Sequence, residues 1–229
     1  MSGLTINLKL KTMSNSTFDF NALVKESKDV LKDPKVYFSA MKTTGGIAEP
    51  VIKAVIYGVL AGIIAFIWSL LKIGSVSSGM LGGAIGLMAI IWYIVAAIIG
   101  LFIGAVIILV ISAICKGTTD FESNIRVTAA LMVMMPISAL LGVFMGISIT
   151  LGSIISLAVS LYGLYLLFHA LTQTLKADTG TSKIVVIILA ALLVLFSVIG
   201  IGAKKKASKF MEDFNQKDLK ELIQDARNN

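Results

Sequence analysis

Long segments without a charged side chain alternate with short polar ones along this chain. Residues 73–115 are 43 consecutive positions without Asp, Glu, Lys, Arg or His, and 127–168 are 42 more. Residues 184–203 add another 20. A helix of about 20 apolar residues crosses a hydrocarbon core of roughly 30 Å, whereas a water-soluble fold has to cover itself with charges. The pattern therefore predicts an all-α, polytopic membrane protein.

Five transmembrane helices follow from the apolar segments and the polar residues between them. We predict them within a membrane domain at 50–203, at about 51–71, 84–115, 127–147, 154–175 and 184–202. The second segment is long, but nothing between Leu87 and Ile99 would turn the chain. One tilted helix that projects beyond the bilayer is therefore favoured over a hairpin.

Local signals predict details of the third and fourth spans. Thr119 and Glu122 have the spacing of a capping box, which predicts the start of the third helix. Pro136 predicts a kink within it, because proline removes a hydrogen bond and its ring clashes with the preceding turn. The uncharged residues 146–153 predict a tight turn before the fourth span.

Polar segments flank the membrane domain, at 1–49 and 204–229. Apolar residues at helical spacing between Phe20 and Leu31 predict an amphipathic helix. Asp33 as N-cap and Pro34 as first helical residue predict a second. This second helix has Val36, Phe38 and Met41 on one face and is stopped by Gly45–Gly46.

Both N-terminal helices have two interpretations. They pack on each other or on the membrane domain, which we favour, or they lie in the headgroup layer or hold a partner. The final segment, 204–229, predicts a charged C-terminal helix.

The distribution of basic residues predicts the orientation. With a cytoplasmic N-terminus, the eight lysines up to Lys53 and the four basic residues Lys116, Arg126, Lys176 and Lys183 lie inside, and Lys72 lies outside. This asymmetry follows the positive-inside rule. Five spans then place the lysines at 204–206 outside, against the rule. The expected location is the inner membrane of a prokaryote or an endomembrane of a eukaryote.

Composition excludes several classes of function. The chain has a net charge of +7, but its basic residues do not form a face interleaved with aromatic residues. We therefore expect the lipid bilayer rather than nucleic acid as a partner. One cysteine and one histidine argue against a structural zinc site, and we expect no cofactor. No Asp, Glu, Lys or Arg lies deep in a span, which argues against a proton relay. No catalytic motif is recognisable, so we expect no enzymatic activity.

Two groups of residues inside the spans are candidate sites. Glycines four apart allow close helix packing, within one bundle or in a homo-oligomer: Gly58/Gly62, Gly100/Gly104 and Gly142/Gly146. Tyr162, Tyr165 and His169 form a possible polar site within the fourth span, because intramembrane ionisable groups are often functional. A neutral histidine bonded to a neighbouring helix is the favoured interpretation.

The order of these features resembles that of a known family. The features are Asp33-Pro34, Tyr37-Phe38, Glu49-Pro50, Phe121–Arg126, Met135-Pro136 and Leu161–Leu171. Together they cover roughly 30–202 and are similar to the Yip domain family, the five-span Rab-GTPase-interacting membrane proteins and their prokaryotic relatives. The resemblance implies a cytoplasmic N-terminus and, in eukaryotes, roles in vesicle trafficking through partner binding. The charged tail at 204–229 departs from the family pattern.

The sequence therefore predicts a non-enzymatic membrane adaptor or assembly subunit with protein partners. The alternative is a transporter or channel component for a neutral or lipid substrate, since the spans offer no charged pathway.

Overall fold

The computed structural model describes residues 19–71 and 82–202, and every regular element in these ranges is helical. The elements are α1 (Phe20–Lys32), α2 (Pro34–Ala40), α3 (Ala48–Leu70), α4 (Gly82–Ile114), α5 (Phe121–Leu131), α6 (Met134–Leu141), α7 (Val143–Ile147) and α8 (Ile149–His169). A π-helical turn, η1 (Ala170–Thr174), continues α8, and the last described helix is Thr179–Gly202. The predicted charged helix at 204–229 lies outside the described residues.

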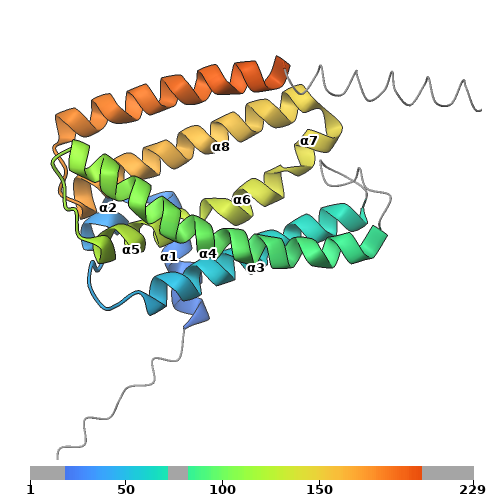
Figure 1. Ribbon diagram of the computed structural model, residues 1–229, viewed down its shortest axis with the longest axis horizontal. Helices are drawn as coiled ribbons and strands as arrows, with labels where there is room; N and C mark the ends of the chain where they lie inside the picture. The colour runs from blue at the N-terminus through green and yellow to red at the C-terminus, as the bar shows by residue number, and fades with distance from the viewer. Residues whose placement is uncertain (1–18, 72–81, 203–229) are drawn as a thin grey trace, which may run out of the picture.

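Five helical segments in the described ranges are long and apolar enough to cross a bilayer. They are Ala48–Leu70, Ile90–Ile114, Phe121–Ile147, Ile149–Thr174 and Thr179–Gly202. The second belongs to α4, which is one continuous helix of 33 residues. The prediction of five long apolar helical segments, with a single long helix as the second, is therefore confirmed. Figure 1 shows the five segments running along the long axis of the molecule.

The N-terminal helices and the polar loops meet at one end of this bundle, on the left in Figure 1. We call this end, formed by residues 19–53, 114–126 and 175–183, the charged end. Two backbone hydrogen bonds join its loops: the Thr118 amide donates to the Leu175 carbonyl at 2.7 Å, and the Asp178 amide donates to the Cys115 carbonyl at 2.8 Å. The ends of four successive spans are thereby fixed relative to one another.

Both N-terminal helices pack on the bundle. Leu23 and Val30 of α1 and Phe38 of α2 are buried in the same apolar core as residues of the spans. The Tyr162 hydroxyl donates to the Leu31 carbonyl at 2.5 Å, and the Thr174 hydroxyl donates to the Phe38 carbonyl at 2.6 Å. These contacts hold α1 and α2 against α8 and η1.

The start of α2 follows the prediction, whereas its end does not. The Asp33 carboxylate accepts a hydrogen bond from the Val36 amide at 3.1 Å, and Pro34 is the first helical residue. The helix ends at Ala40, five residues before Gly45, and Val36 is exposed rather than part of the buried face. Gly45 and Gly46 have φ angles of 130° and 85°, so they turn the linker into α3.

The third span is broken where proline predicts a kink. Met132 and Val133 separate α5 from α6, and Pro136 lies in the first turn of α6. The proline ring would clash with the carbonyl four residues earlier, which is that of Met132, so the helix is interrupted there. The Met135 amide instead bonds to the Met132 carbonyl in a tighter turn, at 2.9 Å.

Two predicted boundaries of the third span need correction. Asp120, not Thr119, caps α5: its carboxylate accepts from the Ser123 amide and hydroxyl, both at 2.8 Å. These hydrogen bonds hold the pKa of Asp120 below its usual value. Only Ser148 of the predicted turn at 146–153 lies outside a helix, because α7 ends at Ile147 and α8 begins at Ile149. Gly152 permits this hairpin, since a Cβ there would lie 2.5 Å from the Met145 backbone.

Candidate functional site: a polar pocket at the charged end

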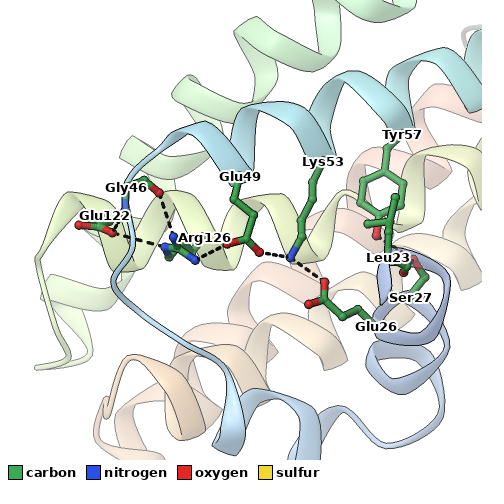
Figure 2. A network of polar contacts seen from close by, with 9 residues as sticks. All are labelled: Leu23, Glu26, Ser27, Gly46, Glu49, Lys53, Tyr57, Glu122 and Arg126. Carbon is green, nitrogen blue, oxygen red and sulfur yellow. Dashed lines mark hydrogen bonds and ion pairs between the residues drawn. The ribbon is translucent and has the colours of Figure 1, made fainter. Parts of the chain in front are cut away.

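A continuous chain of ion pairs joins α1, α3 and α5 (Figure 2). Lys53 Nζ of α3 lies 2.6 Å from a carboxylate oxygen of Glu26 in α1 and 2.8 Å from one of Glu49. The other Glu49 oxygen accepts from Arg126 Nη1 of α5 at 3.0 Å. Arg126 Nε in turn lies 3.5 Å from Glu122, one helical turn earlier. Charges from three separate helices are therefore coupled.

The linker between α2 and α3 is fastened to the same chain of ion pairs. The Gly46 amide donates to Glu122 at 2.5 Å, and the Gly46 carbonyl accepts from Arg126 Nη2 at 3.0 Å. A Cβ on Gly45 would lie 2.7 Å from the same Arg126 nitrogen, and the φ angle of 130° at this position also favours glycine. The linker thus supplies one hydrogen-bond acceptor, the Gly46 carbonyl, to a buried arginine.

A second polar contact joins α1 to α3, one turn farther into the bundle. The Ser27 and Tyr57 hydroxyl oxygens lie 2.8 Å apart, and Ser27 also donates to the Leu23 carbonyl at 2.7 Å. Figure 2 shows this contact beside the Lys53–Glu26 pair. Helix α1 is therefore fixed to α3 at two successive levels.

A pocket of about 580 Å³ lies between these helices. Its walls come from α1, α2, the start of α3 and α5. The residues that line it are Glu26, Asp29, Asp33, Val36, Tyr37, Ala40, Met41, Lys42, Glu49, Pro50, Lys53, Arg126 and Ala129. This volume falls within the range of small-ligand sites, roughly 300–1,000 Å³, and seven of the thirteen lining residues are ionisable acids or bases.

The electrostatics of the pocket are uneven. The side chains of Arg126 and Lys53 are only 6% and 13% exposed, whereas those of Glu26, Glu49 and Glu122 are 31–46% exposed. Burial raises the pKa of the Tyr37 phenol, and the negative charges of Glu26 and Glu49 raise it further. The two cations are therefore more deeply buried than the carboxylates with which they pair.

The predicted polar site in the fourth span lies outside this pocket. The Tyr165 and His169 rings are 4.7 Å apart edge to face, and the Tyr162 and Tyr165 rings are 5.7 Å apart. His169 Nδ1 is buried and has no hydrogen-bond partner among the described residues. Tyr162 instead binds the backbone of α1 through its hydroxyl. The three side chains are brought together, and their role stays a prediction.

The predicted packing glycines have different surroundings. A Cβ on Gly58 would lie 2.8 Å from Ala97 Cβ, and one on Gly62 would lie 2.9 Å from Ile90 Cα, both in α4. A Cβ on Gly104 would lie 2.8 Å from Thr128 of α5.

The other glycines of that set, Gly100, Gly142 and Gly146, are exposed. A Cβ on Gly100 would meet nothing within 4 Å, and one on Gly142 would lie 3.2 Å from the Ala139 carbonyl oxygen of the preceding helix α6. Close approach of helices therefore occurs where α3 meets α4 and where α4 meets α5.

Sequence reasoning missed the chain of ion pairs. It took Lys53 and Arg126 as charges that indicate the orientation, Glu122 as part of a capping box, and Glu49 as part of the family resemblance. One signal was present: Glu49–Lys53 and Glu122–Arg126 are both acid–base pairs four residues apart. Each pair opens an odd-numbered span, and those spans begin at the same end of the bundle.

The fold and the pocket define an integral, multi-pass α-helical membrane protein with a charged, hollowed end. Within 19–71 and 82–202, no three His, Cys, Asp or Glu side chains form a group that could hold a metal ion. The Yip1 domain model matches residues 28–201, so the chain belongs to the Yip1 domain family. No curated protein and no solved structure matches it.

Proposed function

We propose that this protein is a non-enzymatic membrane adaptor or assembly subunit, and that partner proteins bind at the pocket of the charged end. The pocket is the observation that carries the proposal, because four helices and a linker combine to keep seven acids and bases around one cavity. Membership of the Yip1 domain family supports a role without catalysis. The bilayer surrounds the apolar spans, which leaves the charged end for a partner.

The proposal includes a division of the chain and an orientation. Residues 1–49 form an N-terminal amphipathic region, 50–203 the membrane domain and 204–229 a charged tail. We place the charged end in the cytoplasm, because twelve of the thirteen basic residues up to Lys183 then lie inside.

Cysteine labelling tests this orientation. In a Cys115→Ser background, a cysteine at Lys183 is expected to resist an impermeant maleimide in intact cells and to react after the membrane is permeabilised. Labelling of the Lys183→Cys variant in intact cells would reverse the orientation.

Site-specific cross-linking tests the adaptor role. Val36 lines the pocket and is exposed, so a photoreactive residue there is expected to cross-link a partner that copurifies in stoichiometric amount. The same residue at Ile187, an exposed position on the last described helix, is expected to give no such product. Ala40→Trp, which adds an indole at the pocket wall, should reduce the product, whereas Ser39→Trp beside it should not.

Other results of the same experiments would contradict the proposed adaptor role. Equal cross-linking from Val36 and Ile187, or no effect of Ala40→Trp, would contradict a partner site in the pocket. Absence of any partner, together with flux of a neutral lipid through reconstituted protein, would support the transporter alternative instead.

A further inference from the structure

The acidic and the basic side chains of α1 and its C-cap residue lie on different sides of the helix. Each of three acids directly follows a lysine, at 25–26, 28–29 and 32–33. Glu26, Asp29 and Asp33 are spaced three and four residues apart, so they share one side of the helix, and all three line the pocket. The three lysines do not line it. A nearly neutral segment thus turns its negative side toward the cavity.

The pocket keeps an excess of negative charge after its ion pairs are formed. Glu26 and Glu49 line the pocket together with their partners Lys53 and Arg126, whereas Glu122, which also pairs with Arg126, does not line it. The carboxylates of Asp29 and Asp33 make no ion pair within the described residues, and one further cation, the exposed Lys42, lines the wall. The lining therefore carries one more negative than positive charge, because Glu26, Asp29, Asp33 and Glu49 stand against Lys42, Lys53 and Arg126.

Two further residues in the wall favour a ligand larger than a single metal cation. Tyr37 is one of the lining residues, and aromatic rings attract cations. Arg126 is nine-tenths buried and lines the pocket; its Nη1 and Nη2 atoms have one hydrogen-bond acceptor each, and its Nε faces Glu122 at 3.5 Å without a hydrogen bond to a described residue. A buried donor without an acceptor favours a ligand that brings an oxygen.

We infer that the pocket binds a lysine or arginine residue in an extended segment of a partner protein, whose side chain pairs with Asp29 and whose backbone carbonyl accepts from Arg126. This inference rests on the proposed adaptor role and names the chemistry of the partner. A peptide supplies both the cation and the oxygen. A phospholipid headgroup would have to place its phosphate beside four carboxylates, so it fits less well.

Peptide binding to the full-length protein tests the inference. The protein is reconstituted in phosphatidylcholine nanodiscs, and two dye-labelled peptides are titrated, one with three lysines and one with glutamines in their place. The lysine peptide is expected to bind at least about tenfold more tightly, and more weakly at high salt. Asp29→Asn is expected to weaken it about threefold to fivefold, as for a solvent-exposed charge pair. Asp29→Glu should retain the affinity.

Controls separate local recognition from net charge and from misfolding. Lys28→Gln changes the charge on the neighbouring face of α1 and should not weaken the lysine peptide. Asp29 is exposed and its side chain makes no hydrogen bond to a described residue, so Asp29→Asn should melt with the parent protein.

Three results would overturn the inference. They are equal affinities of the two peptides, an Asp29→Asn variant that binds as the parent does, and loss of lysine-peptide binding when phosphatidylethanolamine is added to the disc. The last would assign the pocket to a lipid ammonium group. A stoichiometric cross-link at Val36 with equal peptide affinities would leave the adaptor role standing and remove only this ligand.

Discussion

Arg126→Met is expected to lower the melting temperature of the detergent-solubilised protein by roughly 5–10 °C, which corresponds to about 2–4 kcal/mol. Arg126 is buried, pairs with Glu49 and Glu122, and donates to the Gly46 carbonyl. Methionine has a similar length without charge, so the change removes all three interactions. It leaves two neighbouring carboxylates without their shared cation. Because those carboxylates are partly exposed, we expect less than the full cost of breaking a buried pair.

Two comparisons isolate the role of the ion pairs. Lys183→Met removes an exposed positive charge at the same end of the bundle and should change the melting temperature by at most about 1 °C. The double variant Glu49→Gln/Arg126→Met should lose less in melting temperature than the sum of the decreases in the two single variants, since the two residues interact directly. Equal melting temperatures for Arg126→Met and Lys183→Met would show that the chain of ion pairs does not stabilise the fold.

The spans could be predicted from the sequence because a single physical requirement fixes them. A bilayer demands about 20 apolar residues per crossing, so the segments without charge predict both the number and the approximate place of the helices. Proline likewise acts on its own helix, so Pro136 predicted the break at Met132–Val133. The family resemblance also rested on features in fixed order, and the Yip1 domain match over 28–201 confirms it.

The pocket could not be predicted, because it depends on pairs that are distant in the sequence. Glu49 and Arg126 are 77 residues apart, and Gly46 and Glu122 are 76 apart. Each of these residues also has a local role, at a helix start or in a loop, that explains its presence without a partner. Only packing of α1, α3 and α5 at one end shows that the charges belong to one cavity.

The extent of the turn predicted at 146–153 was wrong for a related reason, because only Ser148 separates α7 from α8. Glycine and serine favour turns, but in an apolar hairpin they also allow helices to approach closely. Gly152 serves the second purpose, because it lies in α8 against the Met145 backbone. Small residues in a span therefore do not by themselves distinguish a close contact between helices from a turn.

The contact between α3 and α4 provides the clearest test of small-residue packing. α4 lies along α3, and Gly58 and Gly62 of α3 face its backbone. Around Gly58, an added Cβ would lie 2.8 Å from Ala97 Cβ, 3.0 Å from the Tyr93 carbonyl oxygen and 3.2 Å from Ile94 Cα. Two of these atoms belong to the backbone of α4, so no change of rotamer can relieve the clash.

Gly58→Leu is therefore expected to push α4 away from α3 and to lower the melting temperature in detergent by about 4–10 °C, from an overpacking cost of about 1–3 kcal/mol. Gly100→Leu is the matched control, because Gly100 is also a helical glycine within a span but an added Cβ there meets nothing within 4 Å. Loss of glycine from a helix interior is itself favourable by up to about 1 kcal/mol, so Gly100→Leu should melt at the parent temperature or slightly above it. If Gly58→Leu melted with Gly100→Leu, the close approach of α3 and α4 would not contribute to stability. A matching loss in both variants would instead mean that the glycines act through the flexibility of the helices, since Gly100 has no neighbour to displace.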